Sequence, residues 1–114
     1  MAMGHFFDGK ATLVVGTHTH VPTSDTMILE KGTAYQTDAG MCGDYNSVIG
    51  MNKENSLNRF MKKKFVYRTD TNKNFPAEGE ASLCGLIVEC DVKTGLANRI
   101  NQFIYGGELK NSQQ

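Results

Sequence analysis

Cysteine, net charge and long apolar runs are all scarce in this 114-residue sequence. Its three cysteines, Cys42, Cys84 and Cys90, are odd in number and lack CxxC spacing, which argues against a disulfide framework or a zinc knuckle. Twelve basic and twelve acidic residues cancel, so no overall field favours nucleic acid or a membrane surface. No apolar stretch approaches the roughly 18 residues of a membrane span, and no signal-peptide pattern opens the chain. We therefore expect a cytoplasmic protein with reduced thiols and no membrane partner.

The chain is expected to contain short helices and strands, and it shows no internal repeats. Apolar periodicity, glycine-rich turns and a capping asparagine at position 52 define the expected elements. We expect the end of a helix at residues 1–7, strands at 11–16, 27–29 and 33–37, a loop at 38–46, a helix from Asn52 through Lys63, and a hairpin of strands 81–91 and 96–105. The pattern predicts an α/β (α+β) fold with a mixed sheet, one main helix and a C-terminal β-hairpin.

Two further features concern the surface and the core. Cys84 and Cys90 fall on one face of the first hairpin strand at period two, which predicts that both are small core residues. A basic cluster at residues 62–64 is interpreted as a solvated helix end. We treat residues 1–114 as a single partial domain, and we expect the polar residues 106–114 to form a flexible tail.

The sequence Gly-Thr-His-Thr-His at residues 16–20 directly follows the first expected strand. His18 and His20 lie on the same side of an extended backbone, and neutral imidazole is the commonest side-chain metal ligand. Two ligands do not complete a zinc or two-metal site, and the pair is equally compatible with an incidental polar strand end. The remaining histidine, His5, is interpreted as a surface residue of the first helix.

Cys42 offers a competing chemistry. It lies between flexible glycines in Gly-Met-Cys-Gly and could act as a nucleophilic thiol, with His18 or His20 as the base and Asp38 as the group that orients it. Isolated cysteines are more often buried and inert, so the metal-site hypothesis is the stronger of the two.

Longer strings around the histidines resemble a known family. Asp8-Gly9-Lys10, then VVGTHTHVPTSD and ILEKGTAYQTDAGMCGDYNSVIGM, are similar to the C-terminal part of the bacterial YmdB-like metallophosphoesterases of the calcineurin-like fold. The resemblance continues through the Asn58-Arg59-Phe60 helix and the hairpin. It implies the C-terminal portion of an αββα sandwich with a dinuclear iron, manganese or zinc site that hydrolyses phosphodiesters such as 2′,3′-cyclic nucleotides. By the same resemblance, His18 and His20 are metal ligands. The family more usually has a small hydroxyl residue at the position of Cys42, which argues against a cysteine hydrolase.

The other ligands of that family have no counterpart in these residues. The resemblance places the acidic, asparagine and remaining histidine ligands in segments N-terminal to this chain, so we expect a fragment of the phosphodiesterase that is inactive alone. Half a sandwich leaves an apolar sheet face uncovered, which predicts a homodimer or larger oligomer. A separately encoded N-terminal half is a further candidate partner. The alternative function is a non-catalytic α/β homo-oligomer that retains the fold.

Overall fold

A computed structural model of the chain describes residues 1–61, 75–109 and 112–113. It confirms the expected α/β class and most element positions. In chain order the elements are α1 (Ala2–Phe7), β1 (Leu13–Val15), β2 (Met27–Ile28), β3 (Ala34–Gln36), β4 (Gly43–Asp44), α2 (Lys53–Phe60), β5 (Ala81–Cys90), β6 (Ala97–Tyr105) and β7 (Ser112–Gln113). The predicted extension of the second helix to Lys63 and the basic cluster at residues 62–64 lie outside the described residues.

The first sheet has the strand order β1-β3-β2 and is mixed, as expected: β1 runs parallel to β3, and β2 runs antiparallel to it. Helix α1 packs on this sheet through Gly4, where an added Cβ would lie 2.6 Å from the Tyr35 ring. The carboxylate of Asp8, just after the helix, accepts hydrogen bonds from the backbone amides of Lys31 and Thr33. These contacts fix the end of the sheet at which β3 begins.

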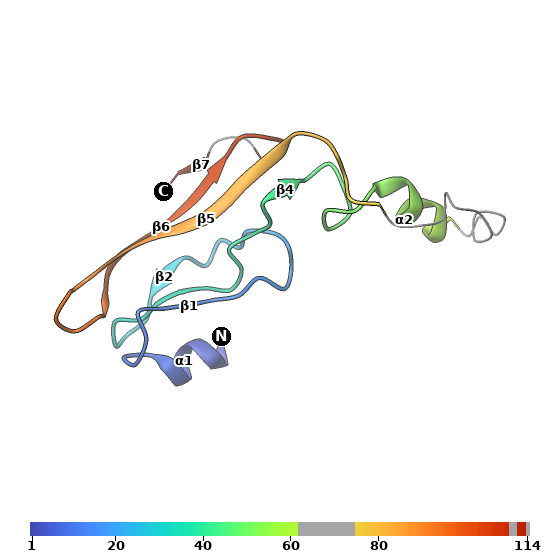
Figure 1. The fold of residues 1–114 in the computed structure, drawn as a ribbon. Coiled ribbons are helices and arrows are strands. Elements are labelled where there is room, and N and C mark those ends of the chain that lie inside the picture. The colour runs from blue at the N-terminus through green and yellow to red at the C-terminus, as the bar shows by residue number, and fades with distance from the viewer. Residues whose placement is uncertain (62–74, 110–111, 114) are drawn as a thin grey trace.

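The second sheet is built on the long hairpin β5–β6, flanked by β4 and β7 in the order β4-β5-β6-β7. Figure 1 shows the hairpin on one side of the first sheet and α1 on the other. The described elements thus form three layers, helix, sheet and sheet, of the expected αββα arrangement. Helix α2 does not cover the outer face of the hairpin, because it projects away from both sheets (Figure 1).

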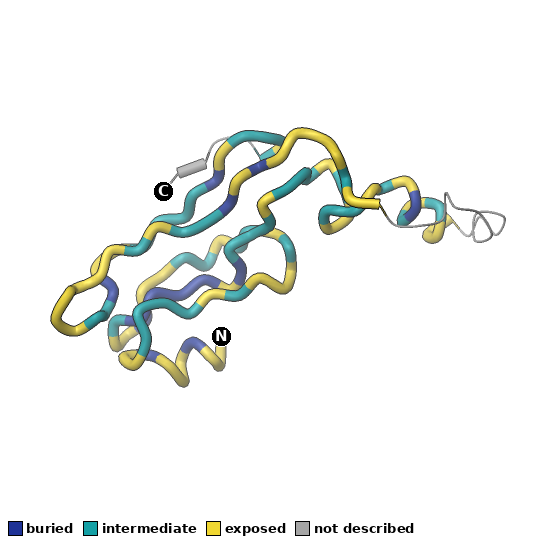
Figure 2. The backbone as a smooth tube through the Cα atoms, in the orientation of Figure 1, coloured by how far each residue is buried: buried dark blue, intermediate teal, exposed yellow. Residues whose placement is uncertain are grey.

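Burial is concentrated on β3, whose three residues are all buried. Figure 2 shows this dark band within the first sheet, with long exposed stretches elsewhere. Large apolar side chains remain exposed on the outer side of the hairpin, including Leu83 at 50%, Ile87 at 56% and Tyr105 at 59%. Together with Phe103, which stacks on Tyr105, we call these residues the hairpin face. A shallow cavity of about 250 Å³ lies along it.

Two details differ from the sequence-based expectations. Cys84 is buried as predicted, but Cys90 is exposed, because the register of β5 and β6 shifts between Glu89 and Cys90 and ends the alternation there. The expected loop at 38–46 contains the short strand β4, which pairs with the start of β5. In the C-terminal tail, β7 pairs with β6, whereas Lys110, Asn111 and Gln114 lie outside the described residues.

Candidate metal centre

The loop that carries His18 and His20 begins where β1 separates from β3. Gly16 is needed at this point, because a Cβ there would overlap the carbonyl oxygen of Thr37. The Gly16 carbonyl accepts a hydrogen bond of 2.9 Å from the Ala39 amide, and Thr23 closes the far side of the loop by donating to the Asp38 carbonyl. The histidine loop is therefore anchored at both ends to the segment that follows β3.

Asp38 lies beneath this loop with no exposed surface. One carboxylate oxygen, Oδ2, accepts from the backbone amide and the hydroxyl of Thr19, at 2.5 and 2.8 Å. The other, Oδ1, accepts from the Gly40 amide at 2.8 Å. A single buried side chain thus holds the backbone on which His20 is mounted.

These hydrogen bonds decide the ionisation of Asp38. Burial by itself would raise the pKa of the carboxyl group, because it removes water from the charged form. The donors from Gly40, Thr19 and His20 outweigh burial and hold the pKa of Asp38 below its ordinary value. Asp38 is consequently a buried carboxylate whose charge is satisfied by backbone and hydroxyl donors.

The imidazole of His20 has a defined partner. Its Nδ1 lies 3.1 Å from the carbonyl oxygen of Ile49. A carbonyl can only accept, so Nδ1 must carry the proton in this contact and the lone pair is on Nε2. Both residues have positive φ, 68° for His20 and 47° for Ile49, a conformation that non-glycine residues seldom adopt unless the surroundings hold them in it. The lone pair of His20 Nε2 is thereby available to bind a metal ion.

The other candidate residues lie in different surroundings. His18 is exposed in the same loop, two residues before His20. His5 is an exposed residue of α1, as expected. Cys42 is exposed, and its Sγ donates to the Cys84 carbonyl. Since the Asp38 carboxylate accepts from the Thr19 amide and hydroxyl and from the Gly40 amide, the geometry does not assemble the alternative Cys42–histidine–Asp38 arrangement.

The donor set fits part of a metal centre. Two imidazoles have the right chemistry for iron, manganese or zinc. Across residues 1–61, 75–109 and 112–113, however, no group of three or more His, Cys, Asp or Glu side chains is placed to hold a metal ion. His18 and His20 can therefore supply two ligands, and the described residues do not complete the set.

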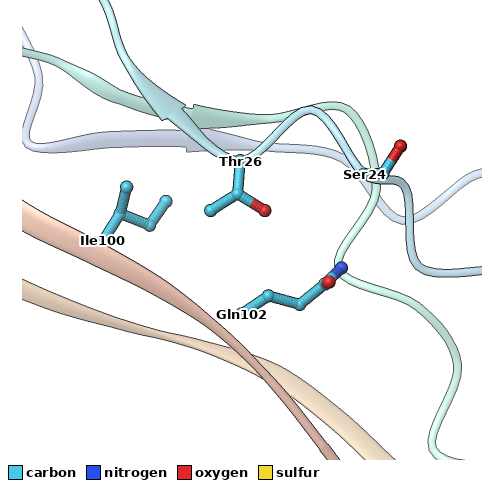
Figure 3. Close-up of a pocket in the computed structure, with 4 residues that line it drawn as sticks. All are labelled: Ser24, Thr26, Ile100 and Gln102. Atoms are coloured by element: carbon cyan, nitrogen blue, oxygen red, sulfur yellow. The ribbon is translucent and has the colours of Figure 1, made fainter. Parts of the chain in front are cut away.

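A polar pocket of about 260 Å³ adjoins this network between the two sheets. Figure 3 shows Ile100 and Gln102 extending from β6 toward Thr26 and Ser24. Thr26 donates to the buried Gln36, whose amide in turn donates to the Asp38 carbonyl at 2.7 Å. This link was not expected from the sequence, where the only signal for it was a glutamine within the short strand expected at residues 33–37.

With the fold and the loop defined, three comparisons show where the chain belongs. A family model described as YmdB-like protein matches residues 1–103. A 2′,3′-cyclic-nucleotide 2′-phosphodiesterase of Bacillus subtilis (strain 168) is 42% identical over 105 residues, which are 91% of this chain and 37% of that protein. The class is that of phosphoesterase-related α/β proteins.

Solved structures agree with this result. A hypothetical protein from Thermus thermophilus gives a TM-score of 0.78 at 39% identity, over 92% of this chain and 38% of that one. A structure described as a novel phosphatase from Mycoplasma pneumoniae gives 0.79 at 37% identity, over 91% and 35%. The chain belongs to the YmdB-like protein family. It spans a little over a third of the length of these relatives.

No helix among the described residues is both long and apolar enough to cross a membrane.

Proposed function

We propose that this chain is the part of a metal-dependent phosphodiesterase that contributes His18 and His20 to a dinuclear metal centre. The observation that carries the proposal is the contact between His20 Nδ1 and the Ile49 carbonyl, which leaves Nε2 available as a ligand. The family and the phosphodiesterase relative support the same chemistry. Phosphodiesters, with 2′,3′-cyclic nucleotides as the leading class, are the proposed substrates.

The residues of the chain have specific tasks in this proposal. His18 and His20 would hold the metal, and the Asp38 network would keep their loop in place before any cation binds. Two divalent cations of iron, manganese or zinc would supply an activated water and neutralise charge on the phosphoryl oxygens. The remaining ligands would come from polypeptide outside these 114 residues, so the chain alone is expected to be inactive.

Metal titration of the purified chain tests the proposal. Calorimetry with Zn²⁺ is expected to detect a site that His18→Ala and His20→Ala each abolish. His5→Ala is the matched control, because His5 is an exposed histidine on α1, and it should bind Zn²⁺ as the parent does. Equal binding by all four proteins would contradict the assignment. Hydrolysis of bis-p-nitrophenyl phosphate with added Mn²⁺ is a second readout.

The alternative function, a non-catalytic homo-oligomer, is favoured by the hairpin face. Leu83 and Ile87 are at least half exposed there, and a contiguous apolar surface of this kind commonly marks a protein interface. A second copy of this chain is the proposed occupant. Metal binding without hydrolysis, together with stable self-association, would favour this function over the phosphodiesterase.

A further inference from the structure

We infer that Asp38 is a positioning residue, which sets the orientation of the His20 imidazole through the backbone and so prepares the metal centre before a cation arrives. The inference rests on the proposed function, because the residue that Asp38 positions is one of the proposed ligands. Asp38 itself does not act as a ligand here. Its oxygens already accept from Thr19 and Gly40.

The first step of the argument is that Asp38 controls the backbone of His20. The carboxylate has no exposed surface, and it accepts hydrogen bonds from both the amide and the hydroxyl of Thr19, the residue directly before His20. His20 has a φ of 68°, a conformation that a non-glycine residue seldom adopts unless its surroundings hold it there. The two bonds to Thr19 restrain the backbone that leads into His20 and therefore the direction in which its side chain leaves the backbone.

The second step is that the fixed direction brings Nδ1 to the Ile49 carbonyl, 3.1 Å away. Ile49 belongs to the segment that follows Asp38, and Gly40 in that segment is held by the same carboxylate. Asp38 thus holds the donor loop through Thr19. On the acceptor side it holds Gly40 at the start of the segment, while Ser47 bonds to Asp44 and Gly50 close to Ile49. Partners that orient a ligating histidine in this way typically change metal affinity about 10- to 100-fold.

Asp38→Asn is the informative variant, because a carboxylate only accepts hydrogen bonds whereas an amide both accepts and donates. In either orientation, the NH₂ group of Asn would face the Gly40 amide or the Thr19 donors. Asp8→Asn is the matched control. Asp8 is 8% exposed and also accepts from two backbone amides, but these belong to Lys31 and Thr33 at the opposite end of β3.

The main readout needs no metal. In the ¹⁵N-labelled, metal-free chain at about pH 8.5, two units above the ordinary pKa of imidazole, long-range ¹H–¹⁵N spectra report which nitrogen of each histidine carries the proton. We expect His20 to be protonated on Nδ1 in the parent and in Asp8→Asn, and to lose this preference in Asp38→Asn. Exchange of the Thr19 amide, which donates to Asp38, should be about tenfold faster in Asp38→Asn than in the control.

Thr19→Val provides a second variant in case Asp38→Asn fails to fold. It removes the hydroxyl bond to Asp38, together with the longer bonds that the same hydroxyl makes to the Val21 backbone, at an exposed position. It leaves the Thr19 amide bond to Asp38 in place and should shift the same signals in the same direction by a smaller factor. Unchanged His20 tautomer and exchange rates in a folded Asp38→Asn protein would overturn the inference, as would equal losses in Asp8→Asn.

Zn²⁺ titration separates this inference from the proposed function. If the inference and the function both hold, Asp38→Asn weakens Zn²⁺ binding about tenfold or more and Asp8→Asn does not. If the parent and the His20→Ala variant take up Zn²⁺ equally, the proposed function fails, while the tautomer result still decides whether Asp38 positions His20.

Discussion

At the residue scale, Gly16 is the position on which the histidine loop most directly depends. It directly follows β1 at the start of the loop. Its Cα lies against the Thr37 backbone, so any Cβ would meet the Thr37 carbonyl oxygen. Backbone atoms cannot rotate out of the way as a flexible side chain can. The glycine in Gly-Thr-His-Thr-His is therefore a packing requirement of the β1–β3 pair rather than a feature of metal binding itself.

Gly16→Ala is expected to destabilise the chain by about 1–3 kcal/mol, the usual cost of forcing extra volume into a close contact. Gly85→Ala is the control, because an added Cβ there would meet nothing within 4 Å; its effect should stay within about 0.5 kcal/mol. Urea unfolding followed by circular dichroism measures both. Equal stability of the two variants would show that Thr37 moves aside at little cost.

The residue scale also separates what the sequence could show from what it could not. The neighbouring loop residues and the period of two made His18 and His20 recognisable as a pair, and Asp38 was visible as a nearby acid. Its connection to the Thr19 amide and hydroxyl was not predictable, because these bonds join residues 19 positions apart across the end of the sheet. The Ile49 carbonyl was equally invisible, since every residue has one.

At the element scale, α2 is the helix with the least support from the rest of the fold. It projects from the two sheets (Figure 1), and Phe60 is 87% exposed. Its start was predictable because Asn52 is a strong N-cap residue, and the Asn52 side chain does accept from the Glu54 amide at 2.9 Å. Local capping is therefore a visible source of stability for α2, alongside the buried Asn55.

Asn52→Ala is expected to destabilise α2 by about 1 kcal/mol, the typical value of an N-cap bond, and to leave the sheets unaffected. Amide exchange within Lys53–Phe60 should accelerate about fivefold while that of β3 stays constant. Asn58→Ala, within the same helix, should instead slow exchange slightly because alanine favours helix. Acceleration in β3 as well would mean that α2 is coupled to the body of the protein.

The hairpin shows the limit of pattern reading for a whole element. Alternation correctly predicted the two long strands and the burial of Cys84, because one face of the hairpin packs against the first sheet. It failed at Cys90, where the register shifts. A sequence pattern does not report where a strand extends past the layer that covers it, and a bulge is not visible in the alternation itself.

At the scale of the whole molecule, the chain is less compact than a typical domain of its length. Its radius of gyration is 18.1 Å, whereas a compact chain of 114 residues has about 13 Å. The described residues supply three layers and leave the hairpin face uncovered. Apolar surface left in water is a driving force for association.

We therefore expect the purified chain to form a dimer or larger oligomer at micromolar concentration, as measured by light scattering after size exclusion. Leu83→Lys combined with Ile87→Lys should shift it toward the monomer, because a charge in the hairpin face would have to be desolvated. Val92→Lys is the control: Val92 is 96% exposed at the hairpin turn, outside the hairpin face. A monomeric parent would contradict the expectation.

The sequence by itself determined the α/β class, the position of most helices and strands, the capping of α2 and the family, because each depends on local periodicity or on a contiguous string of residues. The tertiary structure decided how the histidine loop is held. Residues separated along the chain meet there: Asp38 beneath Thr19 and His20, Ile49 opposite the imidazole, and the Thr37 backbone against Gly16. Such contacts depend on how the ends of β1 and β3 come together in space, and no local pattern encodes that meeting.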